Sequence, residues 1–546
     1  MAPNTGRTAD PLPDAANPLP DAADPLPDAA DPLPDAADVV VIGAGHNALA
    51  CAAYLARAGL EVAVLEAAAQ VGGDTRTEPL TLPGFAHDSC ASAHVLIQSN
   101  PMIRDDELGL RSTYGLRYLR TDPAVVMPQA GGDALVMHRD LEATADEVAR
   151  FSGPDAAELT AMIKEWREGL AAVHGRWSSH LPLGGGEAAQ RYRALRRQSA
   201  WDIVHRRFSH PTVRAFVLWL SMATIQDPRR PGTGFLPSSL TAGRLSFGWT
   251  TPVGGSQALP DALTALVRGY GGTVACSAPV DRVEVSAGRA HAVRTADGRR
   301  VRARRAVVSS AHLARLADML EGAPTPPDLA DARDRWRPGL SVFAVHAALR
   351  ADLAYASPAG PLRPAAAGLG TPEGMARQID AHHRGEPDAT DPWLLVVGQT
   401  AVDPGRAPDG HATFKILTIA PYELSDGSRW ADVKDRYATA LVDLVRARAD
   451  GLAAPDILAL RAESPVDVAA HNPHNLGGSC HGGEFATPDG GVIPGWPVYT
   501  TSVPGLFLTG ATTHPGGSVS GRPGRNAARA VLTDLGIDPA TVMGET

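Results

Sequence analysis

The amino-acid sequence predicts an α/β fold in which three separate stretches of the chain build one largely parallel sheet, with an α+β unit inserted between them. Three observations support this prediction. A strand, a helix and a strand follow one another in residues 38–66, strands return in residues 251–312, and a strand, a glycine-rich loop and a helix occupy residues 503–535. Alternating strands and helices are typical of a parallel α/β sheet.

The first stretch has the pattern of a dinucleotide-binding turn. Residues 39–42 are wholly apolar, as in a strand buried on both faces. Gly43, Gly45 and Ala48 then follow the G-x-G-x-x-G/A spacing, which allows a tight turn, close approach to a pyrophosphate and close helix packing. Glu66 ends the second strand, about twenty residues further on, where a carboxylate can bind a ribose. We therefore predict a Rossmann-type nucleotide site; the alternative is an ordinary strand–helix–strand turn that binds nothing.

Two further glycine-rich segments can contact the same nucleotide. Gly72 and Gly73 follow the acidic residue and offer backbone to a diphosphate. Residues 510–521 form a glycine-rich loop between a strand and a helix, and the free N–H groups of that helix would attract an anion. The two ends of the chain are therefore expected to close over one extended cofactor.

Composition excludes several classes of protein. The net charge is −10, but residues 1–38 hold eight aspartates and one arginine, so the remainder has no basic excess for nucleic acid. Four scattered cysteines without a C-x-x-C pair argue against a disulfide scaffold or a zinc site and favour a reducing, cytoplasmic setting. We predict no metal. No apolar run reaches the roughly eighteen residues of a membrane span, and residues 213–225 are interpreted as a buried or membrane-touching helix.

The chain is divided by these patterns into six segments. Residues 10–37 repeat an acidic, proline-rich unit of seven residues that cannot form a core, so residues 1–37 are predicted to be disordered. The nucleotide-binding domain is predicted to comprise residues 38–120, 251–312 and 466–546. The inserted substrate domain is predicted to have a helical part, residues 121–250, and a sheet part, residues 313–465.

The motifs together resemble a known family. The Gly-Ala-Gly-His-Asn-Ala turn at 43–48, the block at 253–311 and the loop Gly-Ala-Thr-Thr-His-Pro-Gly-Gly-Ser-Val-Ser-Gly at 510–521 are similar to those of phytoene desaturase-related FAD-dependent oxidoreductases. The branch that holds desaturase-type carotene ketolases and the pyridine nucleotide-disulfide oxidoreductase domain protein 2 is the most similar. His471, Asn472 and Pro473, with the glycine pairs at 477 and 482, share this likeness.

The resemblance implies a glutathione reductase-like fold that binds FAD. It places Gly43, Gly45, His46, Asn47 and Ala48 at the pyrophosphate, Glu66 and Ala67 at the adenosine ribose, Gly73, Asp74 and Thr75 again at the diphosphate, Val280 at the adenine, Gly510 and Ala511 at the pyrophosphate and ribityl chain, and Gly517, Ser518, Val519 and Ser520 at the isoalloxazine. Asp74 departs from the arginine or small residue that is common after the glycine pair in that family.

The expected chemistry is a two-electron oxidation of an organic molecule at a C–H or C–N bond. No second glycine cradle offers a nicotinamide site, so oxygen or a quinone is expected to reoxidise the flavin. His514 is a candidate proton-transfer residue because its unperturbed pKa suits that role, although it could instead brace its loop; Ser518 is the second catalytic candidate. A flavin-dependent isomerase and a non-catalytic flavin-binding protein remain alternatives. The substrate is expected to be an apolar or specialised small molecule, with peripheral membrane contact and oligomeric state open.

Overall fold

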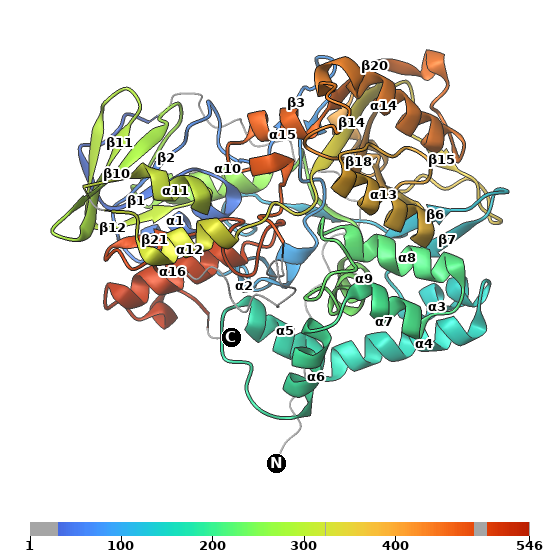
Figure 1. Ribbon diagram of the computed structural model, residues 1–546, viewed down its shortest axis with the longest axis horizontal. Coiled ribbons are helices and arrows are strands. Elements are labelled where there is room, and N and C mark those ends of the chain that lie inside the picture. The colour runs from blue at the N-terminus through green and yellow to red at the C-terminus, as the bar shows by residue number, and fades with distance from the viewer. Residues whose placement is uncertain (1–30, 323, 485–498, 545–546) are drawn as a thin grey trace.

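The computed structural model describes residues 31–322, 324–484 and 499–544, and it contains two large sheets in neighbouring bodies (Figure 1). The first body, at the left in Figure 1, joins the blue N-terminal and red C-terminal parts of the chain. The second body, at the right, holds the other sheet above a group of helices.

The first sheet has a parallel centre. Strand β1 (Ala36–Ile42) pairs in parallel with β2 (Val62–Leu65) on one side and with β12 (Arg300–Ser309) on the other. Strand β21 (Leu506–Leu508) pairs in parallel with β12, which brings the end of the chain beside its beginning. The remaining strands are β9 (Thr273–Ala275), β10 (Val280–Ser286), β11 (Arg289–Thr295) and β13 (Leu320–Glu321).

Alternating side chains of β1 explain why this sheet is buried on both faces. Val39 and Val41 belong to the core formed with α1 (His46–Arg57), α10 (Ala258–Gly269) and α16 (Arg522–Asp534). Val40 and Ile42 belong to a second core with residues of β10, β11 and β12. Successive side chains of a strand point to opposite faces, so the continuous apolar run is what a two-sided burial requires.

The second sheet is antiparallel except where β16 (Ala366–Leu369) pairs in parallel with β6 (Val125–Pro128). Helix α14 (Trp430–Arg446) packs against one face, and α8 (Pro211–Met222) and α13 (Pro372–Arg384) pack against the other. The strand order is β20 (Ile457–Glu463), β14 (Val342–Leu349), β18 (Ala412–Ile419), β17 (Leu394–Val397), β16 (Ala366–Leu369), β6 (Val125–Pro128) and β7 (Ala134–Met137).

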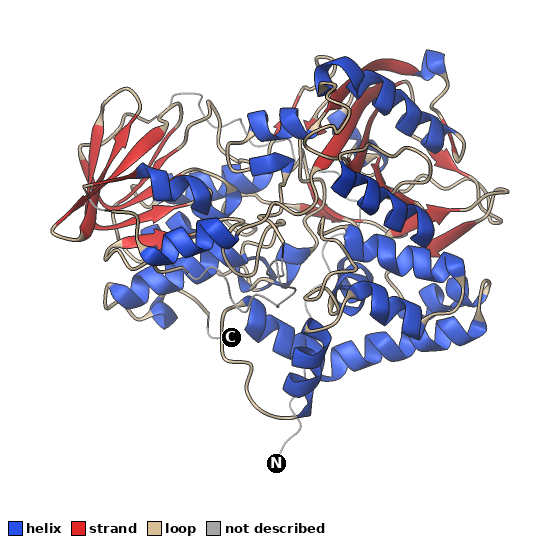
Figure 2. Cartoon of the chain, in the orientation of Figure 1, coloured by secondary structure: helices blue, strands red, loops and turns tan. Residues whose placement is uncertain are grey.

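A group of helices lies beside this sheet (Figure 2). Helix α8 is its apolar centre, and residues 215–222 of that helix are all buried. The membrane-touching alternative for residues 213–225 is therefore wrong. Within the ranges that the structure describes, no helix is long and apolar enough to span a membrane. The other helices are α3 (Leu141–Ala149), α4 (Gly153–Glu165), the π-helical turn Trp166–Leu170, α5 (Ala171–Ser178), α6 (Glu187–Arg196), α7 (Ala200–Arg207) and α9 (Leu236–Phe247).

Three segment boundaries differ from the expected ones. Residues 1–30 of the repeat lie outside the described residues, but Asp31 accepts hydrogen bonds from Arg268 Nε and Val274 N, both at 2.9 Å, and β1 begins at Ala36, so residues 31–37 are not a disordered tail. Strands β6 and β7, from the part expected to be helical, join the second sheet. Strand β13 joins the first sheet, with α11 (Leu313–Met319) and α12 (Pro327–Arg335) beside it, so the first body extends beyond residue 312.

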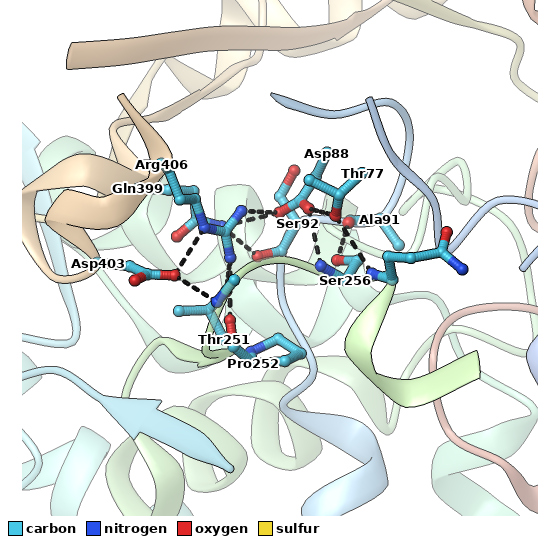
Figure 3. A network of polar contacts seen from close by, with 12 residues as sticks. Thr77, Asp88, Ala91, Ser92, Thr251, Pro252, Ser256, Gln399, Asp403 and Arg406 are labelled. Atoms are coloured by element: carbon cyan, nitrogen blue, oxygen red, sulfur yellow. Dashed lines mark hydrogen bonds and ion pairs between the residues drawn. The ribbon is translucent and has the colours of Figure 1, made fainter. Parts of the chain in front are cut away.

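A buried ionic network connects segments that lie far apart in the sequence (Figure 3). Arg406 donates to Asp88 at 2.7 Å and to Asp403 at 2.9 Å, and all three side chains are buried. Its remaining Nη2 donates to Thr251 Oγ1 at 2.8 Å and to the Pro252 carbonyl. Burial alone would raise the pKa of Asp88, but the charge of Arg406 and several hydrogen bonds outweigh it, so the pKa is lowered overall. The network is complete only when segments around residues 88, 251 and 406 are all folded.

We predict that Arg406→Met destabilises the protein by about 3–5 kcal/mol, because removing one partner leaves two buried carboxylates without their counter-charge. The midpoint and slope of urea denaturation measure the loss. Arg429→Met, which removes an exposed arginine paired with Asp432, is the control and should leave the midpoint unchanged. In the native protein the contribution of Asp88 is present above the ordinary aspartate pKa of about 3.9 and is lost as pH falls through the lower folded value. Equal urea midpoints for Arg406→Met and Arg429→Met would contradict a stabilising role for the Arg406 network.

Candidate functional site

The turn between β1 and α1 forms one end of a cavity of about 530 Å³. Gly43 has φ +88°, and a Cβ there would lie 2.3 Å from Ser310 Oγ, so only glycine fits. Gly45 precedes α1 in an extended conformation, and a Cβ on it would meet no atom within 4 Å. The N-terminus of α1 therefore faces open space, which is the arrangement expected of a phosphate-binding helix.

Glu66 is fixed at the end of β2 by backbone donors. Its two carboxylate oxygens accept hydrogen bonds from Ala44 N at 2.6 Å and Ala68 N at 2.8 Å. Each oxygen keeps a second lone pair, so the carboxylate can still accept from a hydroxyl group. Ala67 and Val280, the first residue of β10, line the cavity beside it.

The glycine pair at 72 and 73 lies against the first turn. Gly72 N donates to the Ala44 carbonyl at 2.9 Å, and both glycines have positive φ, +123° and +57°. Asp74 accepts hydrogen bonds from the amides of Asn472 at 2.8 Å and Asn475 at 2.9 Å. The unusual acid after the glycine pair thus holds a loop that arrives almost 400 residues later in the chain.

The C-terminal loop between β21 and α16 completes this end of the cavity. Gly510, Ala511, Gly517, Ser518 and Val519 all line it. A Cβ on Gly517 would lie 2.6 Å from backbone atoms of His481, so that glycine is required by close packing. Ser518 has φ +81°, a conformation that is costly for a residue with a side chain and that clusters at functional sites.

Several buried polar atoms around this end have no hydrogen-bond partner among the residues that the structure describes. They are His46 Nε2, Asn47 Oδ1, His312 Nε2 and His474 Nε2, and all four residues line the cavity. Burial lowers the pKa of His46 and of the nearby His481 to about 4, so both rings are neutral at neutral pH. Orphaned polar atoms beside open backbone fit an extended polar cofactor, because each such atom costs free energy until it is paired.

Comparison with known proteins identifies the family. The family model described as flavin-containing amine oxidoreductase matches residues 49–532. The chain belongs to this family. It is an FAD-dependent oxidoreductase, and the predicted cofactor and Rossmann-type fold with a substrate domain are confirmed. Among the residues that the structure describes, no cluster of histidine, cysteine, aspartate or glutamate could hold a metal ion.

The relatives agree with the resemblance that the motifs indicate. The chain is 27% identical to the mouse pyridine nucleotide-disulfide oxidoreductase domain-containing protein 2, over 91% of this chain and 93% of the relative. It is 29% identical to hydroxyneurosporene desaturase of Cereibacter sphaeroides, over 91% of this chain and 98% of the relative. A triple mutant of putrescine oxidase has a similar fold, with a TM-score of 0.61, 16% identity and coverage of 92% and 99%.

Two predicted site residues do not reach the cavity. His514 Nε2 donates to the Trp177 carbonyl at 2.5 Å, and the ring packs edge-on to Trp177 with centroids 4.6 Å apart. The carbonyl of Ser520 accepts from Asn100 Nδ2 at 2.8 Å. Neither residue is among those lining the cavity. The structure therefore corrects the catalytic role predicted for His514, whose ring braces the C-terminal loop against α5, and it removes Ser520 from direct contact with the cavity.

The sequence patterns missed the other end of the cavity. Its walls come from α8, α9, β17, β18 and the segment after β4 (His87–Asp88), which carry no local motif. Lys415 on β18 is buried there and donates to the carbonyls of residues 88, 89 and 90 and to Ser92 Oγ. Burial lowers the pKa of Lys415. The missed lining residues include Cys90, Ser92, Leu220, Leu240, Arg244, Trp249, Leu395, Val397, Leu417, Cys480 and His481.

We predict that Gly45→Asp abolishes flavin binding, because it places a carboxylate in the open space before α1 where a phosphate would bind. The variant should lack the visible flavin absorbance while its far-ultraviolet circular dichroism is retained. Gly153→Asp is the matched control, since Gly153 also begins a helix and has open space around its Cβ. Full flavin content in Gly45→Asp would show that the cofactor does not use this turn.

We predict that His514→Gln reduces the acid sensitivity of folding. Burial lowers the pKa of His514 to about 4. Between the unfolded value near 6.5 and pH 4, only the unfolded chain binds a proton at this histidine. The free energy of unfolding therefore decreases as the pH is lowered through this range. The contribution amounts to about 3 kcal/mol at most. Urea midpoints measured from pH 7 to pH 4 should fall less steeply in the variant. The pH profile of flavin reduction should stay unchanged, and a large change in that profile would restore a catalytic role for His514.

Proposed function

We propose that this protein is a dehydrogenase that removes two electrons, as a hydride, from a C–H bond of an organic substrate with an extended apolar body. The observation that carries the proposal is the continuity of the cavity. One cavity joins the glycine-lined end, at Gly45 and Gly517, to walls made by Leu220, Leu395 and Leu417. A site in which an apolar wall adjoins a cofactor cradle suits a substrate that is held by burial rather than by many polar contacts.

The residues that would hold FAD are those of the glycine-lined end. Gly43, Gly45 and the N-terminus of α1 would bind the pyrophosphate, with Gly73 and Thr75 beside it, and Glu66 would accept from the adenosine ribose. Gly510, Ala511, Gly517 and Val519 would support the rest of the cofactor through backbone. When bound, FAD supplies a two-electron acceptor for hydride. The protein contributes orientation and exclusion of water.

The proton that leaves with the hydride needs an acceptor on the cavity wall. His481 is the best-placed side chain, because it lines the cavity beside Gly517 and its ring is neutral. Its Nδ1 lies 3.1 Å from Cys480 Sγ, which orients the ring. Ser518 lines the same wall and remains the second candidate. Lys415 is less suited, since its ammonium group is committed to four oxygen acceptors.

Oxidation at carbon is favoured over oxidation of a protonated amine. Glu66 and Asp74 are the carboxylates among the described lining residues, and both accept hydrogen bonds from the protein at the glycine-lined end. The apolar end offers a cationic substrate no counter-charge, and burying an unpaired charge is costly. Similarity to a desaturase supports the same preference, whereas similarity to putrescine oxidase extends to the fold alone. Oxygen or a quinone is the proposed electron acceptor.

Anaerobic mixing of the holoenzyme with candidate substrates tests the proposal. We expect an apolar substrate to bleach the flavin absorbance with formation of one double bond per flavin reduced, and His481→Gln to slow this step about 10²-fold or more while retaining flavin. Below about pH 4 the ring of His481 is protonated and cannot accept a proton. The difference in rate between the native protein and His481→Gln should therefore not grow further below that pH. Product that forms only after prior reduction of the flavin would instead indicate a redox-neutral isomerase and would overturn the dehydrogenase assignment.

A further inference from the structure

A buried arginine faces the apolar end of the cavity. Arg244 lies on α9, one turn after Leu240, and both residues line the cavity with Leu395, Val397 and Leu417. Only 8% of Arg244 is exposed. Charged side chains are rarely buried without a partner, so the surroundings of this guanidinium decide what it does.

No carboxylate of the described residues pairs with Arg244. No hydrogen bond or ion pair of its guanidinium is found among the described residues, and Nη1 is fully buried without an acceptor. Burial lowers the pKa of Arg244 to about 10, which still leaves it charged at neutral pH. The guanidinium lies over the ring of Trp249, 4.6 Å from the ring centre, which offers a cation–π contact but no hydrogen-bond acceptor.

Trp249 presents a second donor in the same place. The side chain is fully buried, lines the cavity, and its Nε1 has no hydrogen-bond partner. Arg244 and Trp249, which are in contact, thus offer only hydrogen-bond donors to the cavity, and the donor group of Arg244 is charged. The neighbouring cavity wall is made of apolar side chains. Leaving such groups unpaired destabilises the folded protein, and a ligand with anionic oxygens would satisfy both.

A comparable arginine elsewhere in the protein shows what differs at Arg244. Arg196 is also buried and lies 4.0 Å from the centre of the Trp177 ring. Its Nη1 is likewise buried without a hydrogen-bond partner among the described residues, but Arg196 is not among the cavity-lining residues. What distinguishes Arg244 is therefore its position on the cavity, where a ligand can reach its donors.

We propose that Arg244 and Trp249 bind the carboxylate group of the substrate, so that the substrate is an apolar carboxylic acid held with its hydrocarbon body along Leu220, Leu395 and Leu417. The planar guanidinium matches a carboxylate with two parallel hydrogen bonds, and the indole N–H adds a third. This inference rests on the proposed function in placing the substrate in this cavity. It adds a specific anchor, which would fix the position of the oxidised bond by its distance from the acid group.

Binding to the holoenzyme tests the inference without turnover. The probes are the straight-chain carboxylates from octanoate to octadecanoate and cis-parinarate, a fluorescent polyene acid, each compared with its methyl ester. We expect at least one acid to bind at least tenfold more tightly than its ester, measured by titration calorimetry or, for parinarate, by quenching of its emission by the flavin. Arg244→Leu should weaken binding of the acid about 10- to 100-fold and leave the ester unchanged.

Two controls separate ligand recognition from a structural role. Arg196→Leu should leave the preference for acid over ester intact. Arg244→Leu should retain flavin and unfold in urea at a midpoint no lower than that of the native protein, because it removes an unpaired buried charge. A guanidinium that served only the fold would give the opposite result, a lower midpoint with unchanged binding.

Three results would overturn the inference. They are esters that bind as tightly as the acids, failure of every acid in the series to bind, and loss of flavin from Arg244→Leu, which would assign the guanidinium to the cofactor. Failure of the dehydrogenase proposal is distinguishable from these, since it would appear as absence of flavin reduction by any substrate while the charge preference in binding persists.

Discussion

The structure depends on the buried ionic contact between Arg406 and the two carboxylates of Asp88 and Asp403. These residues come from segments more than 300 residues apart, and the contact also takes in Thr251 and the carbonyl of Pro252. Buried charges are stable only when each is paired and hydrogen-bonded. The network therefore holds the segments around residues 88, 251 and 406 together, and the segment that follows Asp88 lines the cavity.

The glycine-lined end of the cavity is held by the same kind of long-range contact on a smaller scale. Asp74 binds the amides of Asn472 and Asn475, and Gly517 packs against the backbone of His481. Each contact joins the first nucleotide-binding segment or the C-terminal loop to residues 472–481. That segment carries His474 and His481 into the lining of the cavity, so the loops that close the cradle also supply polar groups beside it.

The two ends of the cavity have opposite electrostatic characters. The glycine-lined end offers backbone N–H groups, a helix N-terminus and two carboxylates, whereas the other end offers hydrocarbon together with Lys415, Arg244 and the indole N–H of Trp249. Residues of the fold's interior normally satisfy one another, because unpaired buried groups reduce stability. Six buried polar atoms without a partner among the described residues belong to side chains that line this cavity, where a ligand could pair with them: those of His46, Asn47, Arg244, Trp249, His312 and His474.

The sequence by itself determined the fold class and the cofactor, and it indicated the segments from Gly43 to Glu66 and from Gly510 to Val519, which the structure brings to one cavity. These features are local, because a positive φ at Gly43 or a helix N-terminus after Gly45 is set by neighbouring residues. Only the tertiary structure decided that His514 faces Trp177, that α8 is interior, and that Arg244, Trp249 and His481 meet at one cavity. The direction of those side chains depends on packing between elements that are distant in sequence. The spacing of residues within a single segment therefore cannot predict it.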